Sequence, residues 1–126
     1  MQIKHVDTIL LVENIEVSKK FYCEVMGQEI LHDWHNMVVF KERFAIHQAD
    51  ALQPVKVTSQ FIRSGKQGSG NVVLYFQTDD LEGCLTRLKA AGANVIHEII
   101  NLPWDRVFRF LDPDQHVIEM GESLQE

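Results

Sequence analysis

The sequence contains little cysteine and no long apolar run. Only two of its 126 residues are cysteine, Cys23 and Cys84, and both fall in segments with a helical pattern. We therefore expect two free, buried thiols of a reducing compartment rather than a disulfide framework. No apolar stretch approaches the roughly 20 residues of a membrane-spanning helix, and residues 1–4 do not begin a secretory signal. These absences predict a cytoplasmic protein with no membrane partner.

An excess of positive charge is also missing. The chain has 12 basic and 18 acidic residues, which give a net charge of −6 at pH 7. A nucleic-acid-binding face needs clustered Lys and Arg, so we expect no nucleic-acid partner. Proline is scarce too, with 3 residues in the whole chain. A chain of this length buries about two thirds of its unfolded surface, enough for a core without metal or disulfide staples.

A strand–helix–strand–strand–strand pattern occurs twice along the chain. In the first half, apolar positions at helical spacing run from Ile15 to Met26, and in the second half from Leu81 to Ala91. Strands are predicted at residues 3–12, 28–32, 37–40 and 44–49, and again at 71–78, 95–100, 106–111 and 116–120. The least regular stretch, 51–70, has only a weak helical signal around Val55–Ile62.

The two halves form an internal repeat. Val12–Ile15 aligns with Thr78–Leu81, so that the predicted N-caps Asn14 and Asp80 coincide. The pattern predicts an α+β fold of tandem βαβββ modules, whose mixed sheets curve around a shared cleft. We expect one domain, 1–126, with modules 1–53 and 71–126 and a linker at 54–70. Because such modules leave long sheet edges that need cover, we also expect a homodimer.

Two sequence motifs resemble a known family. A strand followed by V-x-[DN]-[IL]-x(2)-[SC]-x(2)-F-Y-x(3)-[LM]-G is matched by Val12, Asn14, Ile15, Ser18, Phe21, Tyr22, Met26 and Gly27. The ending F-x-D-P-D-x-x-x-x-E is matched by Phe110, Asp112, Pro113, Asp114 and Glu119. Together they resemble the glyoxalase, bleomycin-resistance and extradiol-dioxygenase superfamily, also called vicinal oxygen chelate. The resemblance covers almost the whole chain and implies the glyoxalase/bleomycin-resistance/dihydroxybiphenyl dioxygenase fold.

The resemblance also implies four inward positions, on the first, fourth, fifth and eighth strands, where metal-using members usually carry His and Glu. Carried over to this sequence, these positions fall on Asp7, His47, Val73 and Glu119. Valine cannot bind a metal, so the candidate ligand set is Asp7, His47 and Glu119. Such a set suits Zn, Ni, Mn or Fe; a protein without any metal is an equally open alternative.

Further residues are candidates for contact with a substrate. His5 lies on the same strand face as Asp7 by the period of two. The resemblance places Val73 at the fifth-strand position, and Tyr75 is a candidate for the wall of the cleft. Trp104 follows a proline on a loop, and Arg109 can receive a carboxylate or phosphate bidentately. The substrate-binding candidates are therefore His5, Val73, Tyr75, Trp104 and Arg109. The alternative for Arg109, and for Arg106, is a pairing with the acidic turn at Asp112 and Asp114.

The remaining histidines show no spacing typical of a metal site. We expect exposed or turn positions for His32, His35, His97 and His116. Glu119 and His47 are each preceded by Ile in the last strand of their half, which places them at symmetry-related positions of the repeat. We therefore expect both side chains to face one concave pocket, within reach of one ligand or ion.

Three functions follow from the resemblance. The first is a lyase- or isomerase-type enzyme whose divalent metal polarises an oxygenated metabolite, with Glu119 as base or ligand and His47 as its partner. The second is a metal-free drug- or metabolite-binding protein of the bleomycin-resistance type, for which the acidic balance favours a cationic ligand. The third is an extradiol-type dioxygenase. That chemistry needs two histidines and one carboxylate on iron, and the aligned positions supply one histidine.

Overall fold

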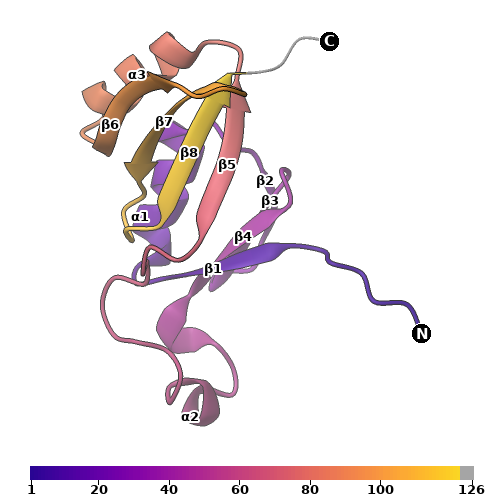
Figure 1. Ribbon diagram of the computed structural model, residues 1–126. Helices are drawn as coiled ribbons and strands as arrows, with labels where there is room; N and C mark the ends of the chain where they lie inside the picture. The colour runs from indigo at the N-terminus through magenta and orange to yellow at the C-terminus, as the bar shows by residue number, and fades with distance from the viewer. Residues whose placement is uncertain (123–126) are drawn as a thin grey trace. The chain divides into compact units, whose positions relative to one another are not determined.

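Two successive units, Met1–Gln67 and Gly68–Glu126, make up the fold. The computed structural model describes residues 1–122. The first unit contains β1 (Thr8–Val12), α1 (Ile15–Lys20), the π-helix η1 (Phe21–Val25), β2 (Ile30–Asp33), β3 (Met37–Phe40), β4 (Phe44–Gln48), η2 (Ala49–Ala51) and α2 (Val55–Thr58). The second contains β5 (Val73–Thr78), α3 (Leu81–Ala90), β6 (Asn94–Asn101), β7 (Arg106–Leu111) and β8 (Val117–Glu122) (Figure 1).

Each unit forms one four-stranded mixed sheet, and the two sheets have the same topology. The strand order is β1-β4-β3-β2 in the first and β5-β8-β7-β6 in the second. The first strand of each unit pairs in parallel with the last, and the other neighbours are antiparallel. The predicted α+β fold with a βαβββ repeat is thus confirmed.

Both helical segments begin at the predicted residue, Ile15 or Leu81, and end one residue before the predicted Met26 or Ala91, the first continuing from α1 as the π-helix η1. Asn14 accepts hydrogen bonds from the backbone N–H groups of the first turn of α1, and Asp80 does the same for α3 through the N–H of Gly83. These side chains satisfy donors that have no partner inside the helix. Gly27 and Gly92 follow the two helical segments with φ of +66° and +78°, values that glycine adopts without steric cost.

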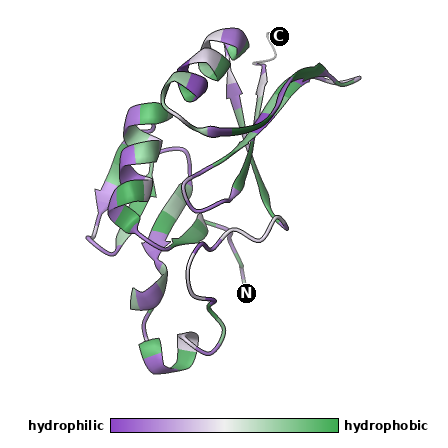
Figure 2. Ribbon diagram, turned by 90° about the vertical axis from the view of Figure 1, so that its left-hand side faces the viewer, coloured by the Kyte–Doolittle hydropathy of each residue, from purple (hydrophilic) through white to green (hydrophobic). Residues whose placement is uncertain are grey.

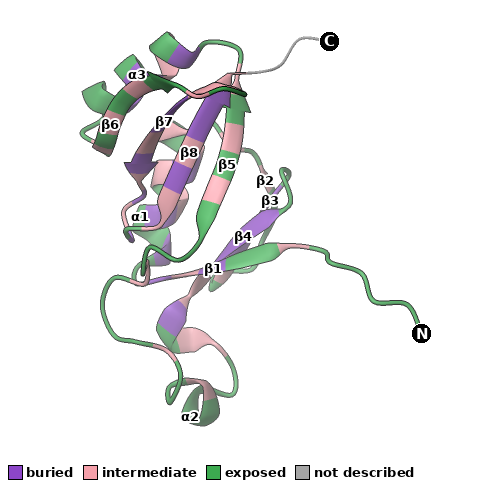
Figure 3. Cartoon of the chain, in the orientation of Figure 1, coloured by how far each residue is buried: buried purple, intermediate pink, exposed green. Residues whose placement is uncertain are grey.

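Ile15 of α1, Tyr22 of η1 and three leucines of α3 are buried, and the sheet strands alternate between a helix-facing side and the opposite side. In the second unit, Arg106, Phe108 and Phe110 on β7 share the side of the sheet that bears α3, since Arg106 contacts Glu82 in the first turn of α3. Ile118 and Met120 on β8 lie opposite Phe110 and Phe108. Both helices carry apolar and polar residues in turn (Figure 2), and β8 is mostly buried whereas β5 is partly exposed (Figure 3).

An aromatic cluster forms the corresponding core in the first unit. Tyr22 is fully buried, and its ring lies 5.7 Å from Phe40 and 5.2 Å from Phe44, centroid to centroid. Phe40 and Phe44 stack at 4.7 Å. Rings at these separations gain both apolar burial and favourable ring-edge contacts, so helix and sheet are held together at one place.

The structure differs from the predicted elements mainly at both ends of the first unit. β1 begins at Thr8 rather than at Ile3, because β4 begins at Phe44, directly opposite Thr8. The segment 54–70, predicted as a linker, includes the short helix α2. In the described part of the chain no helix is long and apolar enough to cross a membrane.

Candidate functional site

A polar row crosses the second sheet on the side turned away from α3. His97 on β6 lies opposite Arg109 on β7, Arg109 lies opposite Glu119 on β8, and Glu119 lies opposite Tyr75 on β5. Because all four are in register, their side chains emerge from one face. We call these four residues the polar row; it brings together three of the predicted site residues, Arg109, Glu119 and Tyr75.

Arg109 is the centre of the polar row. Its Nε donates to Oε1 of Glu119 at 2.8 Å, and its Nη2 lies 2.7 Å from the same oxygen. Its Nη1 lies 3.1 Å from Nε2 of His97. Arg109 thus pairs with Glu119. The sequence left open a pairing of Arg109 with Asp112 or Asp114 instead. The side chains of Arg109 and Glu119 are 31% and 20% exposed, so a ligand on this face can reach the pair.

Tyr75 connects the polar row to the loop between β6 and β7. Its hydroxyl donates to Oδ2 of Asp105 at 2.6 Å and accepts from Nε2 of Gln77 at 3.0 Å. The hydrogen bond to the Asp105 carboxylate, followed by partial burial, raises the pKa of Tyr75. Gly121 leaves room for this contact, since a Cβ there would lie 2.3 Å from Oδ2 of Asp105 and 2.6 Å from the Tyr75 hydroxyl.

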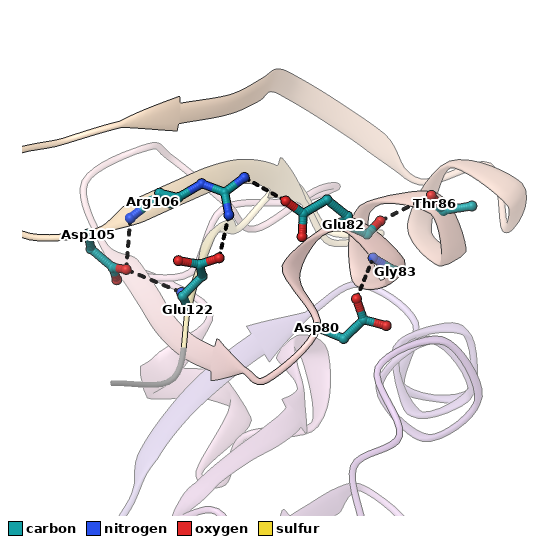
Figure 4. A network of polar contacts seen from close by, with 7 residues as sticks. All are labelled: Asp80, Glu82, Gly83, Thr86, Asp105, Arg106 and Glu122. Atoms are coloured by element: carbon teal, nitrogen blue, oxygen red, sulfur yellow. Dashed lines mark hydrogen bonds and ion pairs between the residues drawn. The ribbon is translucent and has the colours of Figure 1, made fainter. Parts of the chain in front are cut away.

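A second network fixes the same loop from the other side of the sheet. Arg106 pairs with Glu82 at the start of α3 and with Glu122 on β8, and Asp105 accepts from the backbone N–H of Arg106 (Figure 4). The Arg106 guanidinium lowers the pKa of Glu82, and the hydrogen bond to Glu82 in turn raises the pKa of Arg106. These contacts hold Asp105, and Trp104 beside it, at one end of the sheet.

In the first unit, His47 on β4 faces away from the aromatic core, between Leu11 and Met37 on the neighbouring strands. Its Nδ1 lies 2.8 Å from the carbonyl oxygen of Gln48. A carbonyl only accepts, so Nδ1 carries a proton, and in the neutral ring the lone pair is on Nε2. His47 therefore presents Nε2 as an acceptor or metal ligand.

The strand register shows that His47 and Glu119 are not equivalent positions of the repeat, contrary to the prediction. With Asn14 aligned to Asp80, Leu11 corresponds to Gln77; Leu11 lies opposite His47, and Gln77 lies opposite Gly121. The counterpart of His47 is thus Gly121. By the same register the counterpart of Glu119 is Ala45. The sequence comparison misses this two-residue difference because both residues follow an isoleucine. That both face one pocket stays a prediction, because they belong to different units.

The other predicted residues lie apart from these groups. Asp7 pairs with Arg43, whose Nε lies 3.5 Å from its Oδ1. Asp7 precedes Leu11, the residue opposite His47, by four positions, or about 13 Å at the usual strand rise. His5 is exposed and lies 3.4 Å from the Thr8 hydroxyl. Val73 and Trp104 are 51% and 71% exposed.

The implied divalent metal fits these residues poorly. Each carboxylate in an expected ligand position already neutralises an arginine: Asp7 holds Arg43, and Glu119 holds Arg109. The position on β5 is Val73, which has no donor atom. Within either unit, residues 1–122 contain no group of three or more His, Cys, Asp or Glu side chains arranged to hold a metal ion. His47 is the one predicted ligand whose donor atom is oriented for coordination.

A cavity of about 340 Å³ lies elsewhere in the first unit, between the end of β1 and the segment around α2. Val55 and Ile62 supply part of its apolar wall, and Glu13 and Asp50 supply carboxylates. Sequence analysis missed this cavity because most of its lining residues, from Val55 to Gln67, fall in the segment predicted as a linker.

The chain belongs to the glyoxalase-like domain family, whose model matches residues 5–125, and so to the vicinal oxygen chelate superfamily. It is 35% identical to a protein of unknown function from Agrobacterium tumefaciens, over 98% of this chain and 97% of that one, with a TM-score of 0.87. Two structures share the fold at lower identity. One is a glyoxalase/bleomycin resistance protein/dioxygenase from Nocardioides (18%, 99% and 86% covered, TM-score 0.76); the other is a lactoylglutathione lyase from Agrobacterium tumefaciens (22%, 97% and 95% covered, TM-score 0.68). No curated protein matches the sequence.

His97, Gln77 and Asp105 are the residues of this face that sequence reasoning did not assign to a site. His97 was expected to be exposed or in a turn, but it lies half-buried inside β6. Two register shifts interrupt the pairing of β6 with β7, and strand alternation alone cannot place a residue across such irregularities. The predicted free thiols Cys23 and Cys84 are both partly buried, and burial raises the pKa of each.

Proposed function

We propose that this glyoxalase-like domain binds a small molecule without a metal ion, on the face of the second sheet that carries the polar row. The observation that carries the proposal is the occupation of both candidate carboxylates by arginines, Asp7 by Arg43 and Glu119 by Arg109. An arginine paired with a carboxylate offsets its negative charge and occupies one of its oxygens, so the carboxylate attracts a metal ion less strongly.

The same face offers what a small organic ligand needs. Tyr75 is 49% exposed and supplies an aromatic surface, with Val73 beside it on the same strand face. The Arg109–Glu119 pair supplies charged donors and acceptors, and Gln77 an amide. Ligand sites combine apolar contact with a few placed polar groups in this way. Such binding agrees with the name of the Nocardioides structure, which includes bleomycin resistance.

Metal content and ligand binding together test the proposal. Protein purified without a histidine tag is analysed for metals and then titrated with Zn²⁺, Ni²⁺, Mn²⁺ and Fe²⁺. In parallel, glycopeptide drugs and small metabolites are screened by thermal shift in the presence of EDTA. We expect less than one ion per chain, and ligands whose affinity falls in Tyr75→Leu and Arg109→Met. Stoichiometric metal uptake that is abolished in Glu119→Gln would contradict the proposal.

A metal-assisted lyase or isomerase is the second candidate, and His47 is the observation in its favour. Its Nδ1–H bond to the Gln48 carbonyl leaves Nε2 as a ready ligand, an arrangement common in metal-binding histidines. This candidate predicts that His47→Gln lowers metal affinity by roughly 10-fold or more, while Asp7→Asn changes it little. The extradiol type needs a second histidine ligand, and neither Asp7 nor Val73 supplies one.

We also propose a homodimer. The strands β1, β2, β5 and β6 lie at the edges of their sheets, and exposed edges are commonly covered by another chain. Light scattering should give about twice the chain mass of 14.5 kDa. A stable mass near that of one chain at micromolar concentration would contradict the dimer.

A further inference from the structure

The guanidinium of Arg109 has N–H donors that are directed at neither Glu119 nor His97. Of its five N–H groups, the Nε–H and one on Nη2 are directed at Glu119, and one on Nη1 is directed at His97. Within residues 1–122, one N–H on each Nη atom therefore has no protein acceptor. The side chain is 31% exposed, so these two donors are available to a ligand.

The hydrogen-bond partners of His97 favour one tautomer of the neutral ring. Its Nδ1 lies 2.7 Å from the carbonyl oxygen of Glu98, which only accepts, so Nδ1 carries the proton. Its Nε2 lies 3.1 Å from Nη1 of Arg109, which only donates, so Nε2 carries the lone pair. A protonated imidazole would place an Nε2–H donor against the Nη1–H donor, and this hydrogen bond would be lost.

Protonation of His97 changes the net charge of the sheet face that carries the polar row. With a neutral ring, Arg109 and Glu119 cancel and the three side chains together carry no net charge. With a protonated ring they carry one positive charge. The groups on the adjacent elements are Arg109 on β7 and, beyond it, Glu119 on β8. The Glu98 side chain pairs with Lys89 of α3, on the helix side of the sheet. β6 is an edge strand, so no further strand of this sheet adds a charge.

We propose that His97 and Arg109 form a proton-coupled oxyanion site. A carboxylate, sulfate or phosphoryl group of the ligand accepts hydrogen bonds from the two spare N–H groups of Arg109 and from Nε2–H of the protonated His97. The inference rests on the proposed function and names the chemical group that the site recognises. Arg109 thereby contacts the ligand. The protonation state of His97 determines whether the site carries a net positive charge.

The acidic balance of the chain favours a cationic ligand, whereas the proposed site binds an anionic group. A proton on His97 supplies the positive charge that such a group needs at this place. Glu119 and Asp105 both repel an anion on this face, so binding is weak while His97 is neutral. When a proton binds to Nε2 of His97, the site gains a positive charge and a further N–H donor. Since coupling between two ligands is reciprocal, the oxyanion in turn favours the proton on His97.

Sulfate is the appropriate probe, because it stays doubly charged throughout the relevant pH range. The full-length protein, labelled with ¹⁵N and kept in EDTA, is titrated with sulfate at pH 5.5 and 8.5 while the Nε–Hε signal of Arg109 is followed by NMR. We expect sulfate to bind about 10-fold more tightly at pH 5.5, within the usual range of such couplings. Arg109→Met should abolish the response at both values.

Two histidine variants separate a proton switch from a structural role. His97→Gln keeps a polar side chain that does not titrate, so weak sulfate binding should remain but its pH dependence should disappear. His32→Gln is the matched control, because His32 lies opposite Val39 in the first sheet as His97 lies opposite Arg109 in the second; it should leave the pH dependence unchanged. If His97→Gln does not fold, the ¹⁵N signals of the His97 ring in the unaltered protein provide the test. At pH 8.5 these signals should show the Nδ1–H tautomer.

Three results would overturn the inference: no change at Arg109 with sulfate at pH 5.5, a pH dependence that survives in His97→Gln, or an Nε2–H tautomer at pH 8.5. These failures are distinct from failure of the proposed function. Stoichiometric metal uptake would refute metal-free binding and leave the sulfate result standing. Ligands that bind in EDTA, together with no change at Arg109 on addition of sulfate at pH 5.5, would support metal-free binding and refute the oxyanion site.

Discussion

The two sheets have the same topology but opposite chemistry on the sides turned away from their helices. At matched register, the first sheet carries Ile9, Ala45, Val39 and His32 where the second carries Tyr75, Glu119, Arg109 and His97. Three apolar side chains thus replace the phenol and the ion pair. One histidine is common to both rows, but His32 stacks on Trp34 at 4.9 Å, whereas His97 contacts an arginine.

This difference shows which residues are alike in the two modules of the repeat and which differ between them. Apart from Arg106 at the start of β7, the helix-facing core residues Phe40, Phe44, Phe108 and Phe110 are apolar in both units, because they form the cores that hold helix to sheet. The opposite sides differ: Val39 and Ala45 are buried there in the first sheet, at the positions where the second sheet has the partly exposed Arg109 and Glu119. The polar row is therefore a property of the second unit and not of the βαβββ module, and function has to be argued from its residues rather than from the fold.

The largest effect should come from breaking either core. Phe40 in the first unit and Phe108 in the second are fully buried, and Phe→Ala typically destabilises by about 3–5 kcal/mol. Trp34 and Trp104 lie in different units, so single-tryptophan variants report on each unit during urea unfolding. If the chain is one domain, as the sequence predicts, each substitution should lower the midpoint seen by both tryptophans equally. Two separate transitions would show that the units unfold independently.

Substituting Gly121 should act on the second sheet alone. Gly121→Ala places a Cβ against Asp105 and the Tyr75 hydroxyl, which should separate them and cost about 1–3 kcal/mol. Because Asp105 raises the pKa of Tyr75, the alkaline titration of Tyr75 should shift to lower pH, as it should in Asp105→Asn. The contact stabilises the fold below the ordinary tyrosine pKa of about 10, and this contribution is lost as pH rises through the folded value.

Ultraviolet absorbance at alkaline pH, with Tyr22→Phe to isolate the signal, measures this shift. Ala45→Gly is the control in the first sheet, since Ala45 touches no such pair. An unchanged Tyr75 titration in both Gly121→Ala and Asp105→Asn would contradict the role given to Asp105.

The sequence predicts the fold well because the fold depends on local signals. Asn14, Gly27, Asp80 and Gly92 mark helix ends by backbone chemistry that needs no tertiary context. The strands Met37–Phe40 and Arg106–Leu111 are predicted to the residue. The helix α2 was only weakly indicated, since Val55–Thr58 is a single turn with no side-chain cap.

The candidate site is less predictable because it depends on register. Arg109, Glu119 and Tyr75 were named as separate candidates, but their alignment in one row follows from pairings that the sequence does not contain. A register error of one residue places a side chain on the other face of the sheet. An error of two residues keeps the face but pairs the wrong residues of the two modules, as happened with His47 and Glu119. The contact between His97 and Arg109 lies between two register shifts of β6, where counting along the chain fails.

The helix caps should respond alike in the two units. Asn14→Ala and Asp80→Ala each remove the acceptor for N–H groups at a helix start, and such losses cost about 1 kcal/mol. Chemical denaturation of both variants measures the effect. A large inequality would show that one helix contributes little to its unit, and Thr86→Ala within α3 serves as a control that leaves the cap intact.

The smallest effects should come from ion pairs, and here the two units should differ again. Lys41 and Glu29 in the first unit form a pair whose side chains are 54% and 71% exposed, whereas Arg109 and Glu119 are 31% and 20% exposed. Water screens an exposed pair, so its coupling energy should be about 0–0.5 kcal/mol. The less exposed pair, with two guanidinium nitrogens on one oxygen, should reach about 1 kcal/mol.

Double-mutant cycles with Lys41→Met and Glu29→Gln, and with Arg109→Met and Glu119→Gln, measure both energies. The cycle at Arg109 should be repeated at pH 5.5 and 8.5. Protonation of His97 removes the hydrogen bond that helps to hold the guanidinium over Glu119, so the coupling should weaken at the lower pH, while the Lys41–Glu29 coupling stays constant. An Arg109–Glu119 coupling that is equal at both values would mean that His97 does not position the arginine, and the contrast between the two faces would then lie in charge alone.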